Sequence, residues 1–235
     1  MQILLTNDDG LFAEGIQCLR QNLSDLGDII LAAPEKERSA MSHGITIHKP
    51  LRAKKISFEN NIYGWKISGT PADCVKLALD KLLHHPPDIV VSGINNGLNM
   101  GNDILYSGTV SAALEAVMED IPAIAISVEE EATSEDYEYA AKFLKSFLTK
   151  ISPHKLSNKN LININVPRIT LGPISGVEVT VQGLKRYSNR VVTRQDPRGE
   201  KYYWLSGELL NIEASGNTDL AAFGRRAISI TPLRS

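Results

Sequence analysis

The order of apolar and polar positions predicts alternating strands and helices over the first two thirds of the chain. Short, almost wholly apolar runs such as "QILLT" (2–6) and "DIILAAP" (28–34) are typical of buried strands. Between them, "EGIQCLRQNLSDLG" places its isoleucine and leucines at helical spacing and ends at Gly27, a common helix stop. The chain therefore opens with a strand–helix–strand unit.

The same alternation continues further along the chain. The further strands that we expect cover 87–95, 121–128 and 161–167, and the further helices cover 70–85, 109–120 and 134–151. Strands that are apolar along their whole length and separated by helices are typical of parallel sheets. The pattern predicts an α/β fold, a Rossmann-like, mostly parallel sheet with helices on both faces. Two runs without a helix between them, 45–58 and 61–69, are expected to form a hairpin or meander.

The character of the sequence changes after about residue 170. Three β-type runs, 174–182, 190–196 and 201–209, follow one another with polar turns such as "DPRGE", and only then come a helix at 218–226 and a strand at 227–233. We therefore divide the chain into a Rossmann-like catalytic core, 1–170, and a β-rich extension, 171–235. We expect this extension to project as a hairpin and to contact another subunit.

Composition and charge narrow the class of protein. The 235 residues carry a formal net charge of −2, whereas general nucleic-acid binders need a basic excess, so we expect no stable nucleic-acid partner. No apolar run approaches the roughly 18 residues of a membrane span. Cys18 and Cys74 form no CxxC pair, and we expect two reduced, buried thiols. These features predict a cytoplasmic protein without a membrane partner.

Two adjacent carboxylates, Asp8 and Asp9, follow the first strand. Like charges side by side cost free energy unless something compensates them, and a metal ion is the usual compensation. Neighbouring side chains of a regular strand point to opposite faces, so the chain must bend here, and Gly10 permits the bend. A "DDG" triplet alone is also compatible with a helix cap and a turn.

Further oxygen donors lie in loops that follow other strands. The carboxyl ends of parallel strands meet at one edge of the sheet, where ligands bind. "ERSAMSHGIT" supplies the hydroxyl of Ser39, and "SGINNGLNMGNDILYSGT" supplies the amide oxygen of Asn95. Such ligands suit Mg²⁺, Mn²⁺ or Ca²⁺ better than structural Zn²⁺. Ser42 and Asn96 are close enough in sequence to be confused with this pair.

A helix start forms the second part of the predicted site. "YSGTVSAALE" places Ser107, Gly108 and Thr109 where free backbone N–H groups and the helix dipole favour a phosphate, and "SGTPAD" repeats that arrangement. Helix capping would also explain Thr109. A hard metal ion beside a phosphate cradle suggests phosphoryl chemistry.

Taken together, these motifs resemble those of the SurE family of stationary-phase survival proteins, which are metal-dependent 5'/3'-nucleotidases. The resemblance rests on long motifs in order: "LLTNDDG", "PEKERSAMSHGIT", "SGTPADCV", "PDIVVSGINNGLNMGNDILYSGTVSAALE", "LININVP", "DPRGEKYYWL" and "TDLAAFGRRAISITPL". It implies hydrolysis of nucleoside 5'- and 3'-monophosphates, one divalent ion per subunit (Mg²⁺ or Mn²⁺), and a homodimer or homotetramer.

The resemblance also assigns roles to residues. It implies that Asp8 and Asp9 are catalytic, that Asp8, Asp9, Ser39 and Asn95 bind the metal, and that Asn99, Ser107, Gly108 and Thr109 contact the phosphate or substrate. We expect a metal-bound water to attack the phosphorus, although an aspartate nucleophile stays open.

Other interpretations fit less of the sequence. Phosphatases of the haloacid dehalogenase type need their aspartates in a DxD arrangement, "GLNMG" is not GxGxxG, and His43 lies in a serine-rich loop that has no GxSxG elbow. A nucleotide-binding stress sensor without turnover is the alternative of another class. Tyr202, Tyr203 and Trp204 could stack on a base, but we expect them at a subunit interface.

Overall fold

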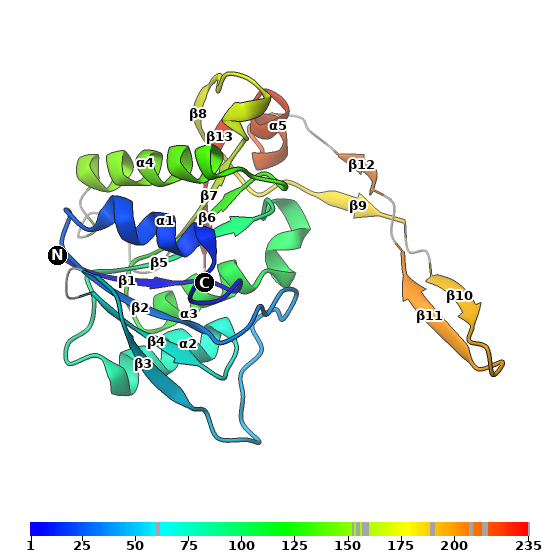
Figure 1. Ribbon diagram of the computed structural model, residues 1–235. Helices are drawn as coiled ribbons and strands as arrows, with labels where there is room; N and C mark the ends of the chain where they lie inside the picture. Colours follow the sequence, from blue (N-terminus) through cyan, green and yellow to red (C-terminus); the bar gives the residue numbers. More distant parts are fainter. Residues whose placement is uncertain are drawn as a thin grey trace.

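The fold is a single large sheet between helices. The computed structural model describes residues 1–59, 62–151, 153, 156, 160–188, 191–206, 209–212 and 216–234. Among these residues nine strands form the main sheet, in the spatial order β3-β4-β2-β1-β5-β6-β7-β13-β8 (Figure 1). Their bounds are β1 Gln2–Thr6, β2 Asp28–Pro34, β3 Ala53–Ser57, β4 Tyr63–Ile67, β5 Ile89–Asn96, β6 Ala123–Val128, β7 Asn160–Val166, β8 Gly176–Val179 and β13 Ala227–Arg234.

Most strand pairs in this sheet are parallel. β1 lies between β2 and β5 and runs parallel to both, and β5, β6 and β7 continue the parallel order. β3 runs antiparallel to β4, and β13 antiparallel to β7. The predicted Rossmann-like, mostly parallel sheet is confirmed. Because β1 separates strands reached in opposite directions, the carboxyl end of β1 is a topological switch point, the usual place for a ligand.

Helices cover both faces of the sheet. α1 (Glu14–Leu23) and α4 (Ser134–Lys150) pack together on one face, and α2 (Pro71–Leu77) and α3 (Gly108–Met118) pack together on the other (Figure 1). The alternation of side chains along β1 divides the core accordingly. Ile3 and Leu5 join the cluster under α1 and α4, whereas Leu4 joins the cluster over α2 and α3. Both faces of β1 are therefore buried, as its apolar sequence predicts.

Two predicted elements differ from the structure. The strand expected from residue 45 begins only at Ala53, because Pro50 lacks an N–H for a ladder and the N–H of Thr46 donates to the Asp73 carboxylate at 2.9 Å. The helix expected over 70–85 begins as predicted, with Thr70 as its cap and Pro71 at its first position. It then changes into a π-helical turn, η1 (Ala78–Leu82), and ends there.

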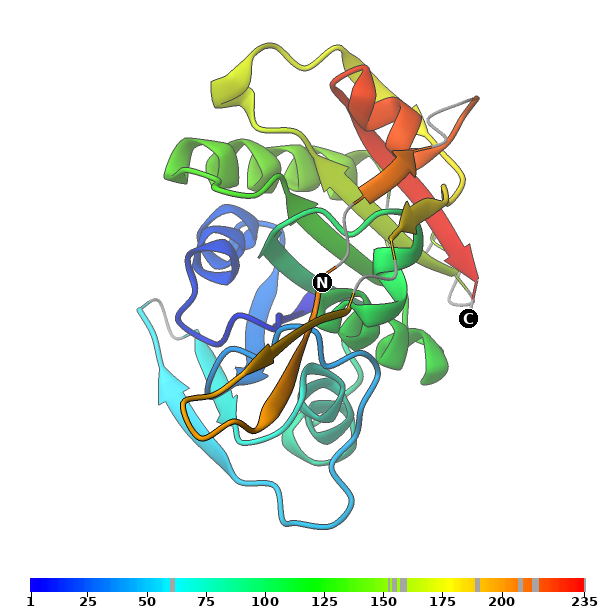
Figure 2. The same ribbon diagram turned by 90° about the vertical axis from the view of Figure 1, so that its right-hand side faces the viewer.

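The C-terminal third contributes both to the sheet and to an arm. β8 and β13 pair within the main sheet, and α5 (Asp219–Gly224) packs on β13. β9 (Lys185–Tyr187) pairs with β12 (Leu209–Ile212), and β10 (Val191–Gln195) pairs with β11 (Lys201–Leu205). These two strand pairs form an arm that stands away from the sheet (Figure 1) and that points toward the viewer, in front of the core, in Figure 2. The projecting hairpin that the sequence predicts is confirmed, whereas the division of the chain into two parts at residue 170 stays a proposal.

In the described part of the chain, no helix combines the length and hydrophobicity needed to cross a membrane.

Candidate active site

The chain bends sharply after β1, as the sequence predicts. The side chain of Asn7 closes the bend through two hydrogen bonds to Gly10: the Gly10 N–H donates to Asn7 Oδ1 at 3.1 Å, and Asn7 Nδ2 donates to the Gly10 carbonyl at 3.0 Å. Gly10 has a φ of +106°, in the region that favours glycine. This turn presents the carboxylates of Asp8 and Asp9 at the carboxyl edge of the sheet.

Asp8 lies directly against the start of α3. Its side chain is almost wholly buried, and the Thr109 hydroxyl donates a hydrogen bond of 2.5 Å to its Oδ1. A Cβ at position 108 would lie 2.8 Å from the Cβ of Asp8, closer than such atoms approach in proteins, so Gly108 permits this contact. The cap of α3 is Ser107, whose hydroxyl accepts from the N–H of Val110 at 3.1 Å. Thr109 is therefore a partner of Asp8, not the helix cap.

The negative charges in the bend are poorly compensated. Burial raises the pKa of Asp8, and this outweighs the hydrogen bonds from Thr109 that lower it. Burial, together with repulsion from Asp8 and Glu37, raises the pKa of Asp9 to about 7. Glu37 was not among the residues predicted from the sequence. It lies two residues before Ser39, and its carboxylate accepts a hydrogen bond from the Ser39 hydroxyl at 2.7 Å. The site therefore favours a cation.

The loop that carries Ser39 is attached to the site at several points. The N–H of Arg38 donates to the Asp8 carbonyl at 2.8 Å. Ser42, the alternative to Ser39, donates its hydroxyl to the Leu105 carbonyl at 2.8 Å, and so acts as an anchor for the loop. His43 Nε2 lies 2.7 Å from a carboxylate oxygen of Glu115, a buried residue of α3.

The two neighbouring asparagines at the end of β5 differ in their hydrogen bonds. Asn96 accepts from the N–H of Ala132 through its amide oxygen, at 3.3 Å. Asn95 donates its amide nitrogen to the Gly97 carbonyl at 2.7 Å, and its amide oxygen has no hydrogen bond to the residues that the structure describes. Because a metal needs a free oxygen, this difference favours Asn95 over Asn96 as a ligand.

Asn99 is held by polar residues of a neighbouring strand that the sequence analysis missed. The Asn165 Oδ1 accepts from the N–H of Asn99 at 2.8 Å, and the amide of Asn163 donates to its carbonyl at 2.8 Å. The amide nitrogen of Asn99 donates to the hydroxyl of Ser127 at 2.8 Å. The available signal was the polar spacing of "NIN" in an otherwise apolar strand, which places two buried asparagines on one face of β7.

The next part of this loop is tied to the C-terminal segment. Asp219, which is fully buried, accepts from the N–H of Gly101 at 2.9 Å and from the N–H of Gly183 at 2.8 Å. Asp103 forms an ion pair with Lys185, with the two atoms 2.5 Å apart. The short helix η2 (Gly101–Tyr106) is therefore fixed by residues more than 80 positions further along the chain.

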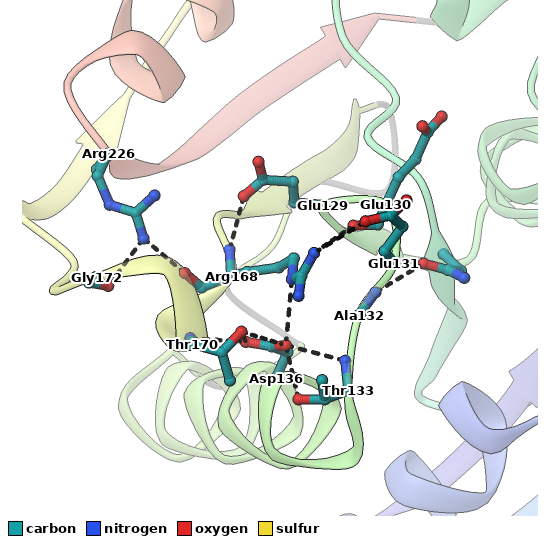
Figure 3. A network of polar contacts seen from close by, with 11 residues as sticks. Glu129, Glu130, Glu131, Ala132, Thr133, Asp136, Arg168, Thr170, Gly172 and Arg226 are labelled. Carbon is teal, nitrogen blue, oxygen red and sulfur yellow. Dashed lines mark hydrogen bonds and ion pairs between the residues drawn. The ribbon is translucent and has the colours of Figure 1, made fainter.

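A network behind the site fixes a third loop. Asp136 of α4 accepts hydrogen bonds from Thr133 and Thr170 and lies 3.5 Å from Arg168 Nε (Figure 3). Arg168 in turn donates its backbone N–H to Glu129 at 3.0 Å and its guanidinium to the Glu130 carbonyl at 3.2 Å. The loop after β6, which carries Glu130, is thereby held in place.

A cavity of about 420 Å³ joins these loops. It is lined by six of the predicted residues: Asp8, Asp9, Ser39, Asn95, Asn99 and Ser107. The other predicted residues, Gly108 and Thr109, lie behind Asp8. A larger cavity of about 570 Å³ lies between residues 45–51, α2 and η1, away from the paired carboxylates of Asp8 and Asp9.

The lining of the smaller cavity is strongly acidic. Glu37, Asp103 and Glu130 add three carboxylates to the predicted pair. Within the described residues, no three His, Cys, Asp or Glu side chains cluster in the manner of a metal centre. The candidate metal ligands are therefore the two carboxylates of Asp8 and Asp9, the hydroxyl of Ser39 and the amide of Asn95, all of which would bind a metal through oxygen.

Comparison with known proteins decides the family. The model of the family described as "Survival protein SurE" matches residues 3–189. The chain belongs to the SurE family. A protein of Carboxydothermus hydrogenoformans called 5'-nucleotidase SurE is 50% identical, over 99% of this chain and 90% of that protein. A protein of Heliobacterium modesticaldum with the same name is 49% identical, over 99% of this chain and 86% of its own length.

The fold agrees with that of a solved SurE protein. The crystal structure of the SurE protein from Aquifex aeolicus matches with a TM-score of 0.84 and 38% identity, over 100% of this chain and 93% of that chain. The resemblance inferred from the sequence motifs is thus confirmed at the level of family and fold.

Proposed function

We propose that this chain is a metal-dependent 5'-nucleotidase that hydrolyses nucleoside 5'-monophosphates, and also 3'-monophosphates, to nucleoside and phosphate. The observation that carries the proposal is the placement of the Asp8–Asp9 turn against the start of α3, where oxygen donors and a helix N-terminus meet. The 5'-nucleotidase names of relatives at about half identity support the same activity.

The metal ligands in this proposal are Asp8, Asp9, Ser39 and Asn95. Their hard oxygen donors suit Mg²⁺ or Mn²⁺, one ion per subunit. The raised pKa of Asp9, the buried carboxylate of Asp8 and the free amide oxygen of Asn95 all fit a cation at this place. When bound, the ion supplies charge neutralisation and acidifies a coordinated water.

The chain's own groups then position the phosphate. A phosphate dianion would be repelled by five carboxylates, so its approach needs the cation and the backbone N–H groups at the start of α3. Ser107, the cap of this helix, and Asn99 both line the cavity, and the hydrogen bonds of Asn163 and Asn165 hold the backbone of Asn99 in position. Asp8 and Asp9 are the candidates to orient the attacking water or to accept its proton.

Phosphate release from the purified protein tests the proposal. A panel of 5'- and 3'-nucleoside monophosphates would be incubated with Mn²⁺ or Mg²⁺, and with a chelator as control. We expect metal-dependent release, and we expect Asp8→Asn to remove most of it while the fold is kept. Absence of release from the folded protein with either metal would instead favour a nucleotide-binding sensor. Trapping of a phosphorylated aspartate would show that an aspartate, and not water, attacks the phosphorus.

We also propose that the arm mediates self-association into a homodimer or homotetramer. Tyr203, Trp204 and Leu205 of β11 are exposed, and the exposed fraction of Leu205 is 91%. Large apolar side chains that are exposed on one short strand pair are typical of interaction surfaces. Light scattering should give a multiple of the chain mass of 25.8 kDa, and the double variant Trp204→Ser, Leu205→Ser should have a lower mass in solution.

A cytoplasmic location stays a proposal, supported by the free thiols of Cys18 and Cys74.

A further inference from the structure

One side chain on the cavity has no structural role in the described part of the chain. Tyr106 lines the cavity, yet 66% of its surface is exposed. No hydrogen bond or ring contact joins its side chain to another described residue, whereas other aromatic rings, such as Phe12 and Phe58, have neighbours. A large ring that is mostly exposed and has no partner gains little from burial in the fold, so its position calls for another explanation.

The backbone of Tyr106 is fixed relative to both halves of the site. Its carbonyl accepts from the N–H of Ser42, at 3.2 Å, in the loop that carries Ser39. The next residue, Ser107, is the cap of α3. Tyr106 therefore lies at the junction between the proposed metal ligands and the proposed phosphate-binding helix start.

The chemistry of the cavity lining indicates which part of a nucleotide the Tyr106 ring would contact. The remaining lining consists of carboxylate, amide and hydroxyl groups with Ala40, Gly97 and Leu98, and Tyr106 is the one aromatic among the described residues of that lining. A nucleobase is flat and needs a flat apolar partner, whereas phosphate and ribose are served by polar groups. Stacking on an aromatic ring accepts any base, because every base has a π face.

We propose that Tyr106 forms the nucleobase subsite of the cavity, by stacking on the base of the bound nucleotide. This inference rests on the proposed nucleotidase function and deepens it: the site takes nucleotides in preference to sugar phosphates that lack a base. It also assigns the base to the cavity rim rather than to Tyr202, Tyr203 and Trp204 of the arm.

The test compares substrates with and without a base. Steady-state kinetics with AMP and with ribose 5-phosphate would be measured for the wild type, Tyr106→Ala and Tyr106→Phe. Leu105→Ala is the matched control, because Leu105 is also 66% exposed and adjacent, but lies outside the cavity lining. We expect Tyr106→Ala to raise KM for AMP about 10-fold, in the range for loss of one aromatic–base stack, with ribose 5-phosphate unchanged. Tyr106→Phe should keep the wild-type KM for AMP, and Leu105→Ala should leave the KM values of both substrates unchanged.

Other outcomes overturn the subsite. An equal rise for both substrates would mean that Tyr106 only supports the loop, and no change for either would place the base elsewhere. A calorimetric titration with AMP separates this inference from the proposed function. If the wild type binds AMP without hydrolysing it, and Tyr106→Ala weakens that binding about 10-fold, the nucleotidase proposal fails and the subsite stands. If Tyr106→Ala binds AMP as tightly as the wild type does, the subsite is wrong whatever the turnover.

Discussion

The hydroxyl of Thr109 donates a 2.5 Å hydrogen bond to the carboxylate of Asp8, and so joins the first turn of α3 to the bend after β1. The two residues are 101 positions apart in the chain. Because one oxygen of Asp8 is occupied by this bond, the orientation of the carboxylate is fixed before any ligand binds.

Thr109→Val should therefore weaken metal binding. Valine keeps the shape of threonine but cannot donate, and loss of a hydrogen bond to a charged group costs about 1.5–3 kcal/mol. We expect the affinity for Mn²⁺, measured by calorimetry, to fall at least about 10-fold. Thr180→Val is the control, since its hydroxyl bonds to that of Thr231 in the buried sheet, at 2.8 Å. Equal affinities in Thr109→Val and the wild type would contradict an orienting role for Thr109.

Asp9→Asn should stabilise the protein in the presence of a chelator. Asp9 is repelled by Asp8 and Glu37, and its burial also opposes the charged form. Removing this charge should raise Tm by a few degrees, because 1 kcal/mol corresponds to about 2–4 °C in a chain of this size. Added Mn²⁺ should raise the Tm of the wild type but hardly that of Asp9→Asn. A lower Tm of the variant in the chelator would show that Asp9 is not under repulsion.

The stability of the network around Asp136 should depend on pH in the acidic range. Burial alone would raise the pKa of Asp136, but the hydrogen bonds from Thr133 and Thr170 outweigh it and lower the pKa to about 2. A carboxylate whose pKa is lower in the folded state stabilises that state above the unfolded value of about 3.9, and this contribution disappears as the pH falls through 2.

Urea unfolding of the wild type and Asp136→Asn at several pH values measures this contribution. The difference in unfolding free energy should be about 2 kcal/mol in favour of the wild type at pH 7, and should shrink between pH 4 and pH 2. Subtracting the variant removes the titration of all other carboxylates. A difference independent of pH would mean that Asp136 acts through its shape rather than its charge.

Glu115→Gln should loosen the loop that carries Ser39. Glu115 is buried, and its two carboxylate oxygens contact His43 at 2.7 Å and Lys76 at 2.8 Å. Loss of the negative charge weakens both contacts, and we expect a fall in Mn²⁺ affinity of about 5-fold or more. Glu119→Gln is the matched control, because Glu119 is half-exposed and meets Lys76 only at 3.5 Å. Similar losses in both variants would exclude a specific role for His43 and Glu115.

The sequence predicts those features that depend on neighbouring residues. The buried strands, the Thr70–Pro71 helix start and the bend at Gly10 follow from local pattern and backbone conformation, and the structure confirms them. The strand expected from residue 45 was wrong because a distant side chain, Asp73, bonds the backbone of Thr46 in place of a neighbouring strand.

The contacts that shape the site are long-range, and this explains why most were not predicted. Nothing in the local sequence of Thr109 distinguishes a helix cap from a partner of Asp8. Likewise, Asn163 and Asn165 are recognisable as unusual in β7, but only the fold shows that they meet Asn99. Loop motifs indicate which residues belong to a site, whereas its supports come from elements that reach it only in the folded chain.

The dependence of this site on Asp219 affects how it can form during synthesis. When a ribosome has made the first 200 residues, every predicted site residue is already part of the chain. Asp219, whose carboxylate holds Gly101, is still untranslated. β13, which pairs with the strand that positions Asn99, is made later still. A nascent chain of that length would thus carry the predicted site residues without Asp219, one of the residues that hold the loop after β5, so that this loop gains its full support only after every predicted site residue has been made.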